Sequence, residues 1–390
     1  MKLPTQLMPT TQPIYLDHAA ATPLDQNVFE VMLPYLRDQF YNPSAGYAAA
    51  QRVDADIEIA RAATAHYLGI RPIEILFTAG GTEANNLAIH GVMCRFPKAK
   101  IITSAIEHDS VLEASRQYDT QQVPVHPTGI VDLDKLKHII DDSVVLISVM
   151  YANNEIGTIQ PIREISQIVA EVRKQRRAAG VRLPLYLHSD AAQAANYLDL
   201  HTARLGVDMM TLNGGKIYGL KQSGCLYVKA GLILQPLIYG GGQERGLRSG
   251  TENVAAIIGF AKALQLVQDS RQVESKRLLE LRDHFVQQLQ LAFPSCSING
   301  SLRRRLPNNV HATFPGIDNE RLLIQLDEAG VQAAAGSACS ASKAESSHVL
   351  QAIGMSDAAA HSSIRFTLGR STTESQLHAT IKILGNFVTI

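Results

Sequence analysis

Residues 211–224, "TLNGGKIYGLKQSG", place Lys216 in a glycine-lined turn that directly follows a short apolar strand. Lysine is usually a solvated surface residue, and a loop charge is one interpretation of this position. A lysine amine at a strand end, where glycines let a ligand approach closely, can instead form a Schiff base with an aldehyde. This stretch alone does not distinguish a solvated lysine from a Schiff-base lysine, so the other segments of the chain are needed.

A pattern of strand, loop and helix repeats along the first part of the chain. Short runs rich in Val, Ile and Leu alternate with helical periods, which is typical of a mostly parallel sheet covered on both faces. The segments that show it are 73–92, 98–118, 143–172 and 184–195, with further strands in 207–219 and 224–231. In such sheets ligands bind beyond the carboxyl ends of the strands. The polar residues that follow these strands are therefore the candidate site.

Beyond about residue 250 the pattern becomes one of α+β type. Residues 273–293 carry apolar side chains at steps of three and four, the period of an amphipathic helix, and strands are predicted within 311–316 and 362–369. We therefore predict a large α/β domain over residues 24–271 and a smaller α+β domain formed by residues 1–23 and 272–390. The glycine-rich segment Tyr239–Thr251 is the most flexible stretch that the composition indicates.

The composition is typical of a cytoplasmic enzyme. Apolar residues make up 46% and charged residues 18%, and 36 Lys and Arg balance 36 Asp and Glu, so no net charge favours nucleic acid or an anionic membrane. The N-terminus lacks the apolar core of a secretory signal, and no run approaches the roughly 18 apolar residues of a membrane span. The basic runs at 173–177 and 303–305 are interpreted as solvated charges.

The cysteines indicate a reducing compartment. Cys94, Cys225, Cys296 and Cys339 stand far apart without a C-x-x-C pair, so we expect neither a disulfide framework nor a metal site. Cys339 lies in "AAAGSACSASKAESS" (333–347), a run of small residues that favours a mobile loop able to bring a thiolate to a substrate. An inert small core residue is the alternative for Cys339, and the other three are interpreted as structural.

Two other segments offer partners for Lys216. "TAGGTEANN" (78–86) puts Gly81 and Thr82 at a predicted helix start, which suits a phosphate, although an ordinary turn is the simpler interpretation of the glycines alone. "LHSDAAQ" (187–193) ends a strand with Asp190, a carboxylate that can cap a helix, bind a metal, pair with an arginine or hold a protonated ring nitrogen. A Schiff-base lysine needs both partners, a carboxylate and a phosphate site.

With these motifs in this order, the chain resembles the cysteine desulfurases of the class-V aminotransferase group. The resemblance implies the type I aminotransferase fold of pyridoxal-phosphate enzymes, with a mostly parallel seven-stranded sheet in the large domain and a smaller α+β domain. It spans nearly the whole chain, through "IYLDHAAATPLD" (14–25), "YNPSAG" (41–46), "FTAGGTEANNLAI" (77–89), "TSAIEHDSVL" (103–112), "VMYANNEIGTIQPI" (149–162), "SDAAQA" (189–194), "NGGKIYGLKQSG" (213–224), "GGGQERGLRSGT" (240–251), "AAGSACSAS" (334–342) and "AHSSIRFTLGR" (360–370).

The resemblance assigns the cofactor-binding residues. It implies that Lys216 carries pyridoxal phosphate, that Asp190 pairs with the pyridinium nitrogen, and that His108 stacks over the ring as an acid or base. Asn213 stands where the family usually has a serine and can still donate a hydrogen bond at the cofactor. The other positions that match are Asn154 and Gln193 for the phenolic oxygen, Gly81 and Thr82 for the phosphate, and Thr251 for the phosphate of a neighbouring subunit. The last role implies a homodimer.

The resemblance also implies the reaction. Arg365 matches the arginine that binds the substrate carboxylate, a role that suits a guanidinium, and Asn42 is expected to assist it. L-Cysteine displaces Lys216 from the cofactor, Lys216 takes the Cα proton, and the Cys339 thiolate takes the sulfur as a persulfide while alanine leaves. A protein that accepts the sulfur, for iron–sulfur cluster assembly or thiolation, is the expected partner.

Three features depart from the family pattern. The family usually has Ser-Gly-His before the cofactor lysine, whereas this chain has Asn213-Gly214-Gly215, so we expect weaker cofactor retention. Tyr47 stands where a serine-rich, histidine-containing segment is usual, which changes the expected substrate entry. The chain stops at Ile390, without the tail by which long-form members dock their scaffold protein, so another carrier or a thiolation enzyme is an equal candidate for the acceptor.

Two alternatives remain at the level of sequence. The first is a related enzyme, a selenocysteine lyase, a cysteine sulfinate desulfinase or another class-V aminotransferase; a plain aminotransferase does not need Cys339. The second is a non-catalytic binding or regulatory relative with a weakened cofactor site. Only Asn213 and Gly215 support it. Five residues that catalysis needs argue together against it: Lys216, Asp190, His108, Cys339 and Arg365.

Overall fold

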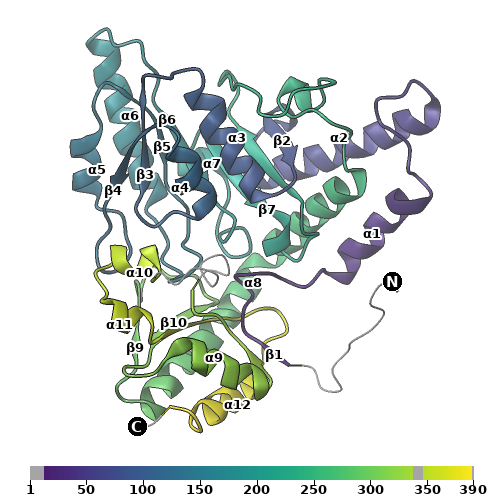
Figure 1. Ribbon diagram of the computed structural model, residues 1–390. Coiled ribbons are helices and arrows are strands. Elements are labelled where there is room, and N and C mark those ends of the chain that lie inside the picture. Colours follow the sequence, from purple (N-terminus) through teal and green to yellow (C-terminus); the bar gives the residue numbers. More distant parts are fainter. Residues whose placement is uncertain (1–12, 337–345, 389–390) are drawn as a thin grey trace, which may run out of the picture.

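A seven-stranded sheet forms the centre of the larger part of the molecule in the computed structural model, which describes residues 13–336 and 346–388 (Figure 1). The strands lie in the order β2, β8, β7, β6, β5, β3, β4, and only β8 among them runs antiparallel to its neighbours. Their bounds are β2 (Ile75–Thr78), β3 (Lys100–Ser104), β4 (Asp119–Val123), β5 (Val144–Ser148), β6 (Tyr186–Asp190), β7 (Met209–Asn213) and β8 (Gly224–Val228). The prediction of a mostly parallel sheet is confirmed.

Helices cover both faces of this sheet. Successive side chains of a strand point to opposite faces, so Leu76 of β2 packs into one hydrophobic cluster and Phe77 into another. The Leu76 cluster includes side chains of α3 (Gly81–Met93) and α4 (Asp109–Ser115). The Phe77 cluster includes side chains of α1 (Gln26–Arg37), α2 (Ala48–Leu68), α6 (Ile162–Ala178) and the first part of α8 (Val254–Ala292). The buried strands are therefore apolar on both sides.

The smaller part of the molecule is built on two short sheets. One is antiparallel, in the order β12 (Ser363–Thr367), β10 (Asn309–Thr313), β9 (Ser297–Ile298), and the other pairs β1 (Ile14–Tyr15) with β11 (Val331–Gln332) in parallel. Helices α9 (Asn319–Glu328) and α12 (Glu374–Leu384) pack here with the second part of α8, around Phe285 and Phe366, whose rings meet edge to face at 5.5 Å. The predicted α/β fold with a smaller α+β part is confirmed.

The remaining elements are short. They are the helices α5 (Leu133–Ile139), α7 (Thr202–Leu205), α10 (His348–Ala352) and α11 (Asp357–Ala360), and the 3-10 turns η1 (Pro72–Glu74), η2 (Gly214–Lys216) and η3 (Glu244–Gly246). In the described part of the chain, no helix combines the length and apolarity that crossing a membrane requires.

Helix α8 runs through both parts of the molecule (Figure 1). It has 39 residues and begins well before the helix predicted at 273–293. Phe260 packs against the large sheet, whereas Phe285 belongs to the core of the smaller part. The division between residues 271 and 272 falls inside this continuous helix, and the domain boundaries stay a prediction.

The other charged residues of the two basic runs are exposed or half-buried, as the sequence predicts, but one arginine in each run is buried. Arg176 is only 4% exposed, and its guanidinium donates to the carbonyls of Asp141 (2.6 Å) and Val144 (2.8 Å), where it ties α6 to the start of β5. Arg305 is 6% exposed and donates to the carbonyl of Ser301 at 2.9 Å. Burial lowers the pKa of Arg305 to about 10, yet it remains charged at neutral pH. Both arginines satisfy buried carbonyl groups, a role that local sequence does not reveal.

Candidate active site

One cavity opens beyond the carboxyl ends of the central strands, where the sequence places its candidates. Loops after β3, β5 and β6, together with η2 after β7, line it, and the start of α3 and a side chain of β12 close it. The predicted site residues on its wall are Gly81, Thr82, His108, Asn154, Asp190, Gln193, Asn213, Lys216 and Arg365. The structure thus brings together residues that lie more than 280 positions apart in the chain.

Lys216 is held by the turn that carries it. The side chain of Asn213 accepts a hydrogen bond from the N–H of Gly215 at 3.1 Å and so caps η2, and Asn196 donates to the Lys216 carbonyl at 2.6 Å. The Nζ atom of Lys216 donates to the carbonyls of Ala19 (2.9 Å) and Ala20 (2.5 Å) in the N-terminal segment. The amine therefore lies on the cavity wall in a defined position, close to neutral acceptors.

Asp190 ends β6 and is fixed on both carboxylate oxygens. Oδ1 accepts from the N–H of Ala192 at 2.9 Å, and Oδ2 accepts from the side-chain amide of Asn85 at 2.7 Å. The residue is 7% exposed and faces the cavity. Burial lowers the pKa of the neighbouring His188 to about 4, so this imidazole is neutral and does not cancel the charge of Asp190. The carboxylate is suited to pair with a protonated nitrogen in the cavity.

His108 caps α4 and is oriented by Ser110. The N–H of Ser110 donates to Nδ1 of His108 at 3.1 Å, and the Ser110 hydroxyl lies 2.8 Å from the same nitrogen. Because Nδ1 accepts a backbone hydrogen bond, the neutral ring carries its proton on Nε2. Asn85 donates to the same hydroxyl at 2.8 Å, and so links the supports of His108 and Asp190.

The start of α3 offers an anion site. Gly80 has φ +127°, a conformation that favours glycine, and no side chain among the described residues caps this helix start, so its first N–H groups are available to a ligand. A side chain at Gly81 would meet Asn213 at 3.4 Å, in the space next to these groups. The carboxylate of Glu83 is paired with Arg248 at 3.0 Å, which offsets its repulsion of an anion. A phosphate fits this end of the cavity.

Gly215 borders a second hollow, continuous with the same helix start through Gly81, Thr82 and Asn213. A Cβ atom at Gly215 would lie 3.5 Å from Cγ of Lys221, an ordinary contact. Lys221 also lines this hollow. The place of the usual histidine side chain is thus next to a lysine that the sequence analysis did not single out.

Arg365 lies on β12 at the far wall of the cavity. Its side chain is 1% exposed, and its η nitrogens donate to Asp17 at 2.6 Å and to the Asn154 carbonyl at 2.9 Å. Nε has no hydrogen-bond acceptor among the described residues. A guanidinium has five N–H donors, and each η nitrogen keeps a second N–H beside these bonds, so Arg365 retains donors for a substrate carboxylate.

Two predicted residues, Thr251 and Asn42, do not line this cavity, and a third lies outside the described residues. Thr251 is exposed and borders a separate hollow with Thr78 and Arg248. Asn42 is exposed, and its side chain accepts a hydrogen bond from the N–H of Ser44 at 3.0 Å. Cys339 lies outside the described residues. The roles of all three stay predictions.

The other cysteines are poor nucleophiles or lie elsewhere. Cys225 and Cys296 are buried, and burial raises the pKa of Cys296 to about 11 and that of Cys225 further still. Cys94 is exposed, with Sγ 3.3 Å from the hydroxyl of Tyr118, away from the cavity. Burial therefore keeps Cys225 and Cys296 as thiols at neutral pH.

Sequence reasoning missed the residues that support the site. Asn85 and Ser110 line the cavity and position Asp190 and His108, and Glu107 lies fully buried beneath them, where its carboxylate accepts from the N–H of Met150 at 2.8 Å. A polar residue on the buried face of a predicted helix was the available signal for Asn85. Glu107 gave none: its carboxylate accepts from the hydroxyl of Ser104 at the end of β3 and from a backbone N–H in the loop after β5, and this second partner is distant in sequence.

Comparisons with known proteins agree with this site. The family model for "Aminotransferase class-V" matches residues 14–379. The chain is 42% identical to the cysteine desulfurase IscS of Dictyoglomus turgidum (strain DSM 6724 / Z-1310), over 96% of this chain and 94% of the relative. It is 39% identical to cysteine desulfurase IscS 1 of Archaeoglobus fulgidus, over 95% of both chains.

Solved structures are similar as well. A NifS-like protein superimposes with a TM-score of 0.88 at 32% identity, over 96% of this chain and 99% of that one. A structure described as SspA in complex with cysteine superimposes with a TM-score of 0.79 at 33% identity, over 91% and 98%. With the site and these likenesses together, the chain belongs to the class-V aminotransferase family and, within it, to the cysteine desulfurases.

Proposed function

We propose that this cysteine desulfurase binds pyridoxal phosphate in the cavity around Lys216 and removes the sulfur of L-cysteine, giving L-alanine and a persulfide on Cys339. The observation that carries the proposal is the meeting of Lys216, Asp190 and His108 in one cavity that ends at an uncapped helix start. When bound, the cofactor supplies an aldehyde that condenses with amines and a ring that withdraws electrons. An amine, a carboxylate and an anion site are what such a group requires.

The residues of this chain divide the remaining work. Asp190 stabilises a positive charge at the ring nitrogen, since hydrogen bonds fix both of its carboxylate oxygens in position. Arg365 orients the substrate by its carboxylate. Lys216 and the Nε2–H of His108 exchange protons with the substrate carbon and sulfur. The supports of these groups are side chains and backbone of the same subunit.

Sulfur transfer requires a thiolate. The Cys339 thiolate attacks the substrate sulfur, so an S–S bond forms as the Cβ–S bond breaks, and the electron pair left on carbon is quenched by a proton to give alanine. The oxidised sulfur stays on Cys339 until a protein thiol accepts it. The acceptor is a carrier, a scaffold or a thiolation enzyme, and Thr251 of a second copy completes the phosphate site in a homodimer.

Product analysis with matched variants tests the proposal. We expect the pyridoxal-phosphate-loaded protein and its Cys94→Ser variant to release alanine from L-cysteine and to gain one sulfur on the Cys339 peptide by mass spectrometry. Lys216→Ala should release no alanine, and Cys339→Ser should lose the persulfide. Unchanged turnover in Cys339→Ser would favour a lyase or desulfinase instead, and the same assay with selenocysteine and cysteine sulfinate would separate these. No alanine from any form would favour the non-catalytic relative.

A further inference from the structure

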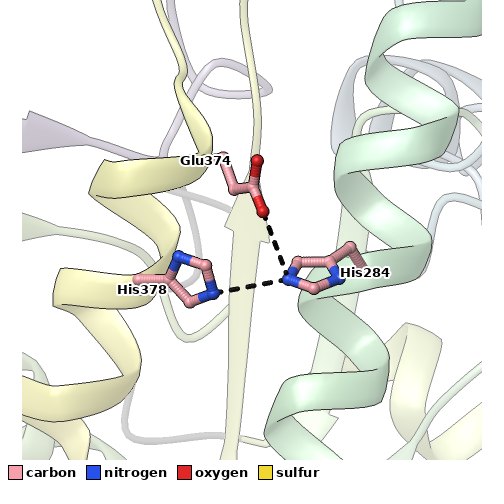
Figure 2. Close-up of side chains that lie close together, drawn as sticks. All are labelled: His284, Glu374 and His378. Atoms are coloured by element: carbon pink, nitrogen blue, oxygen red, sulfur yellow. Dashed lines mark hydrogen bonds and ion pairs between the residues drawn. The ribbon is translucent and has the colours of Figure 1, made fainter.

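Three side chains that can bind a metal meet between α8 and α12, outside the cavity around Lys216 (Figure 2). His284 lies on α8, whereas Glu374 and His378 lie on α12. One ligand atom from each residue lies within 4.8 Å of the other two. The proposed reaction uses none of them, so their convergence calls for a separate explanation.

The distances between these atoms fit tetrahedral coordination. Nε2 of His284 lies 3.4 Å from Nε2 of His378 and 3.6 Å from a carboxylate oxygen of Glu374. Zinc binds imidazole nitrogen and carboxylate oxygen at about 2.0–2.2 Å, so two ligand atoms on a tetrahedral zinc are about 3.3–3.5 Å apart. The two imidazole rings meet edge to face at 86° (Figure 2), so they do not stack flat against each other. A cation therefore fits between these atoms after only small side-chain rotations.

The backbone keeps the three groups together. Glu374 and His378 are four residues apart on α12, which puts them on the same face of the helix. That helix start is fixed by a capping box, in which Thr373 and Gln376 satisfy each other's N–H groups. His284 lies within α8, a continuous helix of 39 residues. Two rigid elements thus supply all three ligands.

The residues around the three ligands can supply a fourth ligand and do not strongly repel a cation. His284 and Glu374 line a hollow on the surface between α8 and α12. Glu280, four residues before His284 on α8, borders this hollow together with Thr372 and Thr373. Arg277 also borders it, but its guanidinium is paired with Glu274 at 2.7 Å and donates to the carbonyl of Thr372 at 2.9 Å. The charge of Arg277 is therefore offset, and Glu280 or a water molecule can complete the coordination.

We propose that His284, Glu374 and His378 bind a divalent transition-metal cation of the zinc class, which cross-links α8 to α12. Two imidazoles and one carboxylate favour Zn²⁺, Co²⁺, Ni²⁺ or Cu²⁺ over Mg²⁺ and Ca²⁺, which prefer oxygen ligands. Because the ligands come from two elements, the cation binds the folded form and stabilises it. The site is structural and independent of sulfur transfer.

Zinc binding to the tag-free, pyridoxal-phosphate-loaded protein tests this site. Each protein is stripped with a chelator, carries Cys339→Ser so that this thiol cannot bind zinc, and is titrated with ZnCl₂ in a calorimeter. We expect one equivalent to bind to the parent and to His138→Ala, an exposed histidine on α5 that serves as the control. His284→Ala and His378→Ala should bind at least about tenfold more weakly, since even residues that only support metal ligands cost 10–100-fold when mutated.

Two further readouts keep the test decisive. Glu374→Gln changes no backbone and should also weaken zinc binding, and zinc should raise the Tm of the parent and of His138→Ala but not of the ligand variants. MgCl₂ should have no such effect. Equal zinc affinity in all five proteins, or a Tm that zinc leaves unchanged in the parent, would overturn the proposal and leave a hydrogen-bonded pair of histidines beside a carboxylate.

Discussion

Gly215 stands where the resemblance leads us to expect a histidine that binds the phosphate. A side chain there would meet Cγ of Lys221 at 3.5 Å and the side chain of Asn213 at 3.6 Å, both ordinary contacts. We predict that Gly215→His folds normally and retains pyridoxal phosphate longer, by several-fold, because one additional hydrogen bond contributes about 0.5–1.5 kcal/mol. The rate of cofactor loss on dialysis measures this retention. A faster loss from Gly215→His than from wild type would contradict the prediction.

Lys221 gives the complementary prediction at the same hollow. Its side chain borders the helix start of α3, where its charge attracts a phosphate. Lys221→Ala should therefore speed cofactor loss. Lys229→Ala should not, because Lys229 follows the end of the antiparallel strand β8, at the edge of the sheet opposite the cavity, and is paired there with Asp208. Equal rates of loss in the two variants would show that Lys221 does not contact the cofactor.

Glu107 gives a prediction about pH. Burial raises the pKa of its carboxyl from 4.5 to about 8, so the folded protein holds this proton while the unfolded chain loses it. The stability that Glu107 contributes is therefore fully present below pH 4.5 and is lost as the pH rises toward about 8. Glu107→Gln stays neutral, so its free energy of unfolding should rise relative to wild type across this window. Urea unfolding at pH 4.5 and at about pH 8 measures the free energy of unfolding of the variant and of wild type. If the difference between the two proteins is the same at both pH values, the raised pKa of Glu107 is contradicted.

At this scale, sequence reasoning located the groups that face the cavity and missed those behind them. Lys216, Asp190 and His108 follow strands, and the strand ends of a parallel sheet converge, so their meeting follows from the pattern. Asn85 and Glu107 act through partners that lie more than 20 residues away in the chain, and Arg176 acts through carbonyls at and just before the start of β5. Such pairings depend on three-dimensional contacts that residue type and spacing do not specify.

Among the elements, the glycine-rich segment before α8 is more firmly held than its composition indicates. Glu244 in η3 is buried and accepts from Arg61 of α2 at 2.8 Å and from the N–H of Phe77 at 2.9 Å. Its φ of +44° is unusual for a residue other than glycine. The ion pair therefore holds η3 against α2, the hydrogen bond from Phe77 holds it against β2, and together they fix the segment that leads to Thr251.

Removing this ion pair should be costly. Glu244→Gln leaves the guanidinium of Arg61 buried without its main counter-charge, so we predict a loss of about 3–5 kcal/mol in the free energy of unfolding. Glu58→Gln removes the exposed partner of Arg61, 56% exposed, and should cost at most about 1 kcal/mol. Urea unfolding of both variants measures the difference, and similar losses in the two would contradict the role of Glu244.

Element boundaries show where periodicity is informative. The strand and helix predicted within 73–92 form as β2 and α3, because the glycines at 80 and 81 separate them. After β6, residues 191–197 form turns rather than a helix, since Asp190 and Gln193 point to the cavity and the N-terminal segment. The antiparallel direction of β8 was also beyond prediction, because a fully buried strand has the same pattern in both directions.

At the scale of the whole molecule, the position of Thr251 predicts a shared site. Thr251 is exposed and lies outside the cavity of its own subunit, which suits a residue that completes the cavity of a second copy. A dimer of one Lys216→Ala subunit and one Thr251→Val subunit then contains one intact site. We predict that the purified mixed dimer regains tight cofactor binding and alanine release at about half the wild-type level, and a statistical mixture of the two variants about a quarter, whereas each variant alone is deficient.

Sedimentation provides the control for that experiment. Wild type and both variants should sediment as dimers, since neither substitution removes a large apolar side chain. A monomer in solution, or mixed dimers no better than the sum of their parents, would contradict a site shared between subunits.

The claim on which the account depends is that Lys216 carries the cofactor of the reaction. We would load the protein with pyridoxal phosphate, reduce the lysine–cofactor linkage with borohydride and map the labelled peptide by mass spectrometry, with and without prior addition of L-cysteine. The account predicts label on Lys216 alone, less label after L-cysteine, and alanine in the supernatant. Label on another lysine, or none at all, would contradict it.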